Sequence, residues 1–172
     1  GFAPHEIPQG PDGLVYPGTC RALTAKERQQ RRAEGTPFAL RLDMAKAVYA
    51  VGSLLWTDAD QGETAAQPDI VRDVVLSRKD TPASYHLAVT VDDHLQGGTL
   101  GRRGEDLFAA THVHRLLQAF LELDTPSYHH HKLLTTEGGE RLAKRDKSQT
   151  IRALRQAGKT PEEVQAMAGM AP

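Results

Sequence analysis

Apolar residues recur at spacings of three and four between positions 108 and 121, and this is the most regular pattern in the chain. Val113, Leu116 and Phe120 would share one face of a helix with this period. The acidic pair at 105–106 suits a helix N-terminus, where carboxylates interact favourably with the helix dipole. The pattern therefore predicts a helix with one buried face.

Other segments predict strands. Over residues 38–42, large apolar side chains at the even positions alternate with other residues, so a half-buried strand with its even-numbered side chains facing inward is expected. The glycine- and alanine-rich stretch that follows, up to Gln67, has mostly loop signals. Residues 70–76 and 128–134 predict two further strands, whereas the apolar segment 84–93 fits a strand or a helix equally well.

Capping signals mark a short helix near the N-terminus. Thr24 and Glu27 form a capping box before a charged stretch, and Gly35 would end that helix. Its side chains are mostly charged or polar, so a solvated helix is expected.

Two more helices are predicted near the C-terminus, after a flexible loop at 137–140. The first would be capped by Ser148 and ended by Gly158. The second would begin at Thr160, with proline at its first position and Glu163 completing a capping box.

Strands that alternate with helices predict an α/β fold, and the composition agrees. A chain of 172 residues that is 39% hydrophobic and 25% charged can bury the core of one globular domain. No apolar run approaches the roughly 20 residues that a membrane helix needs. We therefore expect a cytoplasmic monomer with no membrane contact.

Charge and cysteine content narrow the possible partners and sites. Lysine and arginine total 21 against 22 acidic residues, so the net charge of −1 gives no global field that attracts nucleic acid. Any RNA contact must use a local patch. Cys20 is the single cysteine, which excludes an internal disulfide and a metal site built from several cysteines of this chain.

A group of cationic side chains lies around a pair of glycines near residue 139. Ammonium and guanidinium groups offset negative charge, so a basic loop can hold polyphosphate. A solvated charge run accounts for the same composition and is the commoner outcome for short basic segments. The group comprises Lys132, Arg141, Lys144, Arg145 and Lys147.

Arg102 and Arg103 stand just before the long predicted helix, beside Glu105 and Asp106. A guanidinium can grip a carboxylate through two hydrogen bonds, so an arginine here could select an amino acid with an acidic side chain. Local ion pairing with the neighbouring acidic residues explains the spacing equally well.

Three consecutive histidines, His129 to His131, would place two imidazoles on one face of a strand and one on the other. Such a cluster suggests a metal site. No cysteine or carboxylate stands at ligand spacing nearby, so packing or ligand stacking is the favoured interpretation.

Five segments in order resemble the later part of the catalytic domain of glutamyl-tRNA synthetases and of their short paralogues, the glutamyl-queuosine tRNA(Asp) synthetases. These are class I aminoacyl-tRNA synthetases. The five together cover most of the chain and are far more specific than any one alone. They are YPGTCR at 16–21, ALRLD at 39–43, DVVLSRKDTPASYHLAVTVDD at 73–93, RGEDLFAATHVHRLLQ at 103–118, and YHHHKLL leading to RLAKR.

The resemblance implies roles that the pattern alone does not give. Tyr85 and Arg103 match family positions that contact the glutamate substrate. Lys144 matches the catalytic lysine of the KMSKS-type ATP loop. That loop is here Arg141-Leu142-Ala143-Lys144-Arg145, with arginine for the first lysine and alanine for the serine of the family's usual KLSK form.

Tyr16 and Cys20, spaced as Tyr-x-x-x-Cys, resemble the second half of the zinc (Zn2+) site of the short paralogue. The other two ligands of that site form a Cys-x-Cys just upstream, which this sequence lacks. The HIGH-type motif and the arginine-containing segment before it are missing as well. We therefore expect a fragment of a longer polypeptide that forms no glutamyl-adenylate by itself.

The implied fold is α/β, the second half of a class I synthetase Rossmann-type catalytic domain. Residues 1–37 would be a partial zinc-binding insertion with a short helix. Residues 38–172 would be the C-terminal half of the catalytic domain, including the KMSKS-type loop and short C-terminal helices.

The implied activity is activation of glutamate with ATP and Mg2+, followed by transfer of the glutamyl group to queuosine in the anticodon loop of tRNA(Asp). Two alternatives remain open. One is a fragment of an ordinary glutamyl-tRNA synthetase that charges tRNA(Glu), and the other is a non-catalytic tRNA-binding remnant. The few residues after the KMSKS-type loop and the Tyr-x-x-x-Cys element favour the short paralogue.

Overall fold

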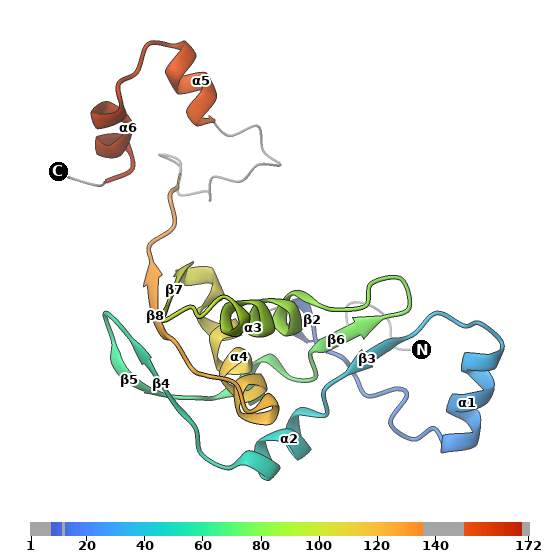
Figure 1. The fold of residues 1–172 in the computed structure, drawn as a ribbon. Coiled ribbons are helices and arrows are strands. Elements are labelled where there is room, and N and C mark those ends of the chain that lie inside the picture. Colours follow the sequence, from blue (N-terminus) through green and yellow to red (C-terminus); the bar gives the residue numbers. More distant parts are fainter. Residues whose placement is uncertain (1–7, 12, 136–149, 170–172) are drawn as a thin grey trace. The chain divides into compact units, whose positions relative to one another are not determined.

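The computed structural model describes residues 8–11, 13–135 and 150–169 (Figure 1). The chain divides into two compact units, Gly1–His131 and Lys132–Pro172. This division does not test the domain boundary at residue 37 that the resemblance implies, so that boundary stays a prediction. Within the described part of the chain, no helix combines the length and apolar character required to cross a membrane.

A four-stranded mixed sheet organises the first unit, in the order β5-β4-β8-β7. β4 (Leu55–Asp58) forms an antiparallel hairpin with β5 (Gly62–Ala65) and pairs in parallel with β8 (Ser127–His131). β7 (Leu100–Gly104) runs parallel to β8. Parallel neighbours need a crossover connection, and α4 (Phe108–Leu121) supplies it between β7 and β8.

The main hydrophobic core forms where α4 meets α2 (Met44–Val51) and the 3-10 helix η2 (Pro68–Val71). α3 (Tyr85–Leu95) also packs on α4. Burial of apolar side chains drives this packing. The buried members of the core are Met44, Ala47, Val71, Val74, Val113, Leu116 and Leu117.

Two small antiparallel sheets complete the first unit. β3 (Ala39–Arg41) pairs with β6 (Val75–Arg78), and β1 (Gln9–Gly10) pairs with β2 (Gly13–Leu14). A second 3-10 helix, η3 (Glu105–Leu107), leads from β7 into α4. In Figure 1, α1 (Ala25–Ala33) lies well apart from α3 and α4 and has no buried residue.

The second unit contains two short helices, α5 (Ile151–Gln156) and α6 (Pro161–Met167). The capping box of α6, from Thr160 to Glu163, is confirmed. The N-cap of α5 is Thr150, whose hydroxyl accepts from the backbone N–H of Ala153, in place of the predicted Ser148. Ser148 and the predicted loop at 137–140 lie outside the described residues.

Patterns of local origin predicted the helices well. The helix over 108–121 is confirmed with eight buried residues, and the capping box that begins α1 is present. The segment that fitted either structure is a helix, because Ser84 caps it by accepting from the backbone N–H of Leu87. The strand expected at 128–134 forms over Ser127–His131.

The loop prediction for the stretch up to Gln67 is wrong, because the structure places α2, β4 and β5 there. Asp43 caps α2, whereas the two strands depend on pairing with each other and with β8. The strand predicted at 70–76 is also misplaced. Its first residues belong to η2, which begins at Pro68, and the strand starts at Val75. β3 forms as expected but all three of its residues are exposed, so the prediction of half-burial is wrong.

Candidate functional site

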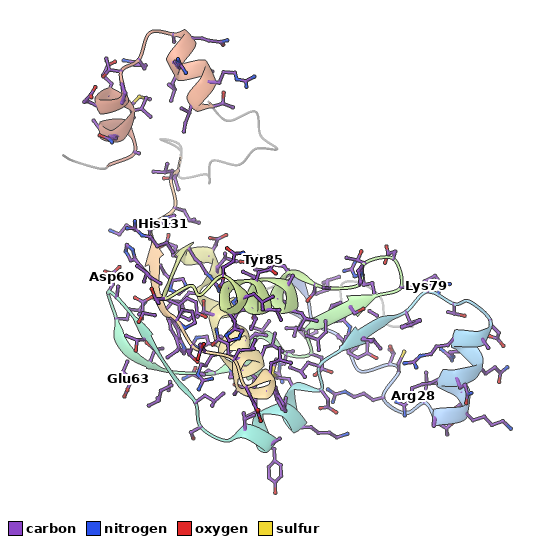
Figure 2. The ribbon with its side chains drawn as sticks, in the orientation of Figure 1. Arg28, Asp60, Glu63, Lys79, Tyr85 and His131 are labelled. Carbon is purple, nitrogen blue, oxygen red and sulfur yellow. The ribbon has the colours of Figure 1, made fainter. Side chains whose placement is uncertain are left out.

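Tyr85 and Arg103, the two residues matched to glutamate contacts, lie on neighbouring elements of the first unit. Tyr85 is the first residue of α3 and is 51% exposed, and Figure 2 shows it on that helix. Arg103 lies in β7 and is only 7% exposed. A buried guanidinium needs partners for its charge and its donors, since burial without them is costly.

Arg103 has such partners on three sides. Its Nη2 donates to Oδ2 of Asp93 at 2.8 Å, and its Nη1 donates to Nδ1 of His114. Its guanidinium carbon also lies 4.8 Å from the ring centroid of Tyr128, a cation–π distance. These contacts hold the guanidinium in one orientation.

His114 links Arg103 to Tyr85. Its ring centroid is 5.8 Å from that of Tyr85 in an edge-on arrangement, and its Nε2 lies 3.1 Å from Nδ1 of His86. Burial, and then the charge of Arg103, lower the pKa of His114 to about 2. The imidazole is therefore neutral at physiological pH, and Tyr85 and Arg103 share it as a neighbour.

Tyr85 and His86 open onto a pocket of about 470 Å³. Its other walls come from the β1–β2 hairpin region, from β3 and from β6 with the loop that follows it. Arg103 is connected to this pocket through His114 and His86 and does not line it. Cationic and hydroxyl groups among the lining residues include Arg41, Ser77, Arg78, Thr81 and Ser84.

The three consecutive histidines of β8 differ in burial. His130 is buried, with Nδ1 2.6 Å from Oδ2 of Asp58 and Nε2 2.9 Å from the hydroxyl of Thr111. His129 lies on the other face of β8, with Nε2 3.4 Å from Oδ2 of Asp60. Among the described residues, no set of three or more potential ligands gathers around a metal position.

Tyr16 and Cys20 lie close together, but the phenol oxygen already accepts a hydrogen bond. The backbone N–H of Cys20 donates to Oη of Tyr16 at 2.8 Å, and Cys20 is exposed. A tetrahedral zinc site needs four ligands. The described residues supply no group of three histidine, cysteine or acidic side chains, so they do not fit a zinc ion. We assign no chemistry to zinc.

The KMSKS-type loop, Arg141 to Arg145, lies outside the described residues. Its role in ATP binding rests on the sequence match alone.

Three residues of the site were missed by sequence reasoning: His86, Asp93 and His114. The signal for His114 was present, because it lies among the buried positions of the long predicted helix, where an ionisable side chain is unusual. Asp93 gave no comparable signal, since its relation to Arg103 depends on how α3 packs beside β7.

Comparison with known proteins identifies the family and the fold. The family model for the catalytic domain of class I tRNA synthetases (E and Q) matches residues 10–170. The glutamate-tRNA synthetase from Elizabethkingia anophelis has a similar structure, with a TM-score of 0.58 and 28% identity over 77% of this chain and 27% of that chain.

Curated relatives give a finer comparison. The Glutamyl-Q tRNA(Asp) synthetase of Rhodobacter capsulatus is 41% identical over 98% of this chain and 61% of its own length. The protein of the same name from Nocardia farcinica is 41% identical over 93% of this chain and 49% of its own length. Glutamate--tRNA ligase 2 of Alkalilimnicola ehrlichii is 38% identical over 87% of this chain and 30% of its own length. The chain thus spans between 30% and 61% of the length of these relatives.

Proposed function

The chain belongs to the class I tRNA synthetases (E and Q), and on this basis we propose that it is part of an enzyme that attaches glutamate to queuosine in tRNA(Asp). The observation that carries this proposal is the 41% identity to a Glutamyl-Q tRNA(Asp) synthetase over 98% of the chain. The partners would be glutamate, ATP and tRNA(Asp) that carries queuosine. The reaction would form glutamyl-adenylate and pyrophosphate first and transfer the glutamyl group afterwards.

Arg103 is proposed to bind the side-chain carboxylate of glutamate. A guanidinium has five N–H donors, and the bonds to Asp93 and His114 engage one on each terminal nitrogen. Each of these nitrogens carries a second hydrogen, so Arg103 retains donors from which a carboxylate could accept. Tyr85 is proposed to contact the amino acid from the pocket wall.

Lys144 is proposed to act in the ATP loop. An ammonium group near the phosphates would offset the charge that develops as pyrophosphate leaves. Mg2+ would supply further charge compensation when it is bound with ATP. In a class I site most of the acceleration comes from holding the glutamate carboxylate against the α-phosphate, which is a matter of positioning.

The test is glutamylation by the full-length gene product, with ATP, labelled glutamate and three RNAs in parallel. These are tRNA(Asp) that carries queuosine, the same tRNA with unmodified guanosine, and tRNA(Glu). Product on the queuosine-bearing tRNA alone would support the proposal. Product on tRNA(Glu) would assign an ordinary glutamyl-tRNA synthetase, and no product on any RNA would favour a non-catalytic tRNA-binding remnant.

A further inference from the structure

The direction of the hydrogen bond between Arg103 and His114 fixes the state of the imidazole. A guanidinium can only donate, so Nδ1 of His114 must accept and carries no proton. His114 is 0% exposed, and burial disfavours the charged form of a histidine. The single proton of the neutral ring therefore lies on Nε2.

That proton fixes the next bond in turn. Nε2 of His114 donates to Nδ1 of His86 across 3.1 Å, so this nitrogen of His86 also acts as an acceptor. The three side chains form a directed chain of donors and acceptors from Arg103 through His114 to His86. Since His86 lines the 470 Å³ pocket, the chain runs from the buried guanidinium to the pocket wall.

The contacts of Arg103 with Asp93 and Tyr128 do not by themselves fix the orientation of the guanidinium, which also depends on His114. Asp93 accepts from Nη2 and balances the charge, while the Tyr128 ring lies under the guanidinium plane. A single carboxylate partner would allow the fork to turn about that contact. The second acceptor, on Nη1, removes this freedom.

We propose that His114 is a positioning residue for recognition of the acidic substrate side chain, because it holds the Arg103 guanidinium in the orientation that receives a carboxylate. This inference rests on the proposed role of Arg103 in glutamate binding. Loss of the acceptor lets the guanidinium turn and thereby weakens the discrimination between glutamate and glutamine. His114 itself does not touch the reacting atoms.

Two substitutions of His114 distinguish the roles of its two ring nitrogens. Asparagine places a polar atom near the position of Nδ1, so His114→Asn can still accept from Arg103. Glutamine reaches the position of Nε2, so His114→Gln retains a contact toward His86, and His114→Leu retains neither. His129→Asn, on the outer face of β8, is the matched histidine control.

The activity readout is glutamate-dependent pyrophosphate exchange by the full-length gene product. We expect His114→Leu and His114→Gln to raise KM for glutamate about 10- to 100-fold, as for loss of a hydrogen bond to a charged group, with a smaller change in kcat. The preference for glutamate over glutamine should fall in parallel, and His114→Asn should restore most of both. Equal KM values for all three variants and the control would overturn the inference.

A second measurement does not depend on activity. Long-range ¹H–¹⁵N spectra of the labelled wild-type protein report which ring nitrogen carries the proton. We expect His114 to carry it on Nε2 throughout pH 5.5–8, and a proton on Nδ1 in that range would overturn the inference. If Arg103 variants raise KM for glutamate and His114 variants do not, positioning fails while the proposed function stands. If neither raises it, the proposed glutamate site fails.

Discussion

The carboxylate of Asp58 lies 2.6 Å from Nδ1 of His130, and both side chains are almost completely buried. Burial works to raise the pKa of Asp58, but hydrogen bonds from His130 and from the backbone N–H groups of Asp60 and Gln61 outweigh it, and the pKa is lowered. Asp58 ends β4 and His130 lies in β8, so the pair joins two neighbouring parallel strands.

Substitution of Asp58 by alanine should therefore cost about 1–3 kcal/mol of the free energy of unfolding, since it leaves Nδ1 of His130 buried without its hydrogen-bond partner. Urea unfolding followed by the fluorescence of Trp56, which packs against His130, would measure this. Asp60→Ala is the matched control, because that carboxylate faces His129 at the surface and should cost less than about 1 kcal/mol. Equal losses for the two variants would contradict the argument.

Acid should destabilise the first unit through His114. Its pKa is about 2 in the folded state and 6.5 in the reference state, so the unfolded chain binds a proton below pH 6.5 that the folded chain does not. The contribution of His114 to the free energy of unfolding is then fully present above pH 6.5. It is lost as the pH falls from there toward 2, by up to about 1.4 kcal/mol per pH unit. The charged or titratable groups that act on His114 are Arg103, His86 and His130.

Unfolding free energies at pH 7.5, 6.5 and 5.5 would test this dependence. The wild-type values should fall below pH 6.5, and His114→Asn should show a smaller slope because it removes one titrating group. His112, whose pKa is also lowered by burial, leaves a residual slope of the same sign. A slope unchanged by the substitution would show that His114 does not titrate on unfolding in this range.

Gly101 keeps room for the ring on which Arg103 rests. A Cβ at this position would lie 2.9 Å from Cδ1 of Tyr128, which is fully buried and cannot move aside. Gly101→Ala should cost about 1–3 kcal/mol of the free energy of unfolding through overpacking. Leu100→Ala, at an exposed neighbouring position, should cost less than about 1 kcal/mol, and a larger loss at 100 than at 101 would be the contrary result.

The shape of the Arg103 side chain should matter as well as its charge. Arg103→Lys keeps the charge but cannot engage Asp93 and His114 with one planar group, so KM for glutamate should rise about 10- to 100-fold. Arg102→Lys, at the exposed neighbouring position, should change KM less than about threefold. Pyrophosphate exchange measures both, and similar effects would move the proposed carboxylate contact away from Arg103.

Sequence reasoning succeeded where the determinants of structure are local. The helix over 108–121 follows from side-chain period, and the capping boxes at Thr24 and Thr160 involve residues three apart. It failed for β4 and β5, which pair with each other as a hairpin. β4 also pairs with β8, where Tyr128 stands 70 residues after its partner Asp58. No local pattern encodes the pairing of β4 with β8.

The site shows the same division. The resemblance named Tyr85 and Arg103, but the pattern around them gave no reason to place His114 between the two. That relation requires α3, α4 and β7 to pack together, and only the tertiary structure shows it. For the histidine run the sequence favoured packing or ligand stacking, and in the structure His130 is buried with hydrogen bonds to Asp58 and Thr111.

The parallel register of β7 and β8 has a consequence for how the protein can evolve. Arg102 stands opposite His129 and Arg103 opposite His130, so two identical side chains receive opposite environments from their place in the ladder alone. A deletion of one residue before β7 would move Arg103 to the position opposite His129 and place Gly104 opposite His130. Such a change would be nearly invisible in composition, yet it would disconnect Asp93 and His114 from the arginine whose backbone position suits them. Selection should therefore tolerate substitutions in the 97–99 turn far more readily than changes in its length.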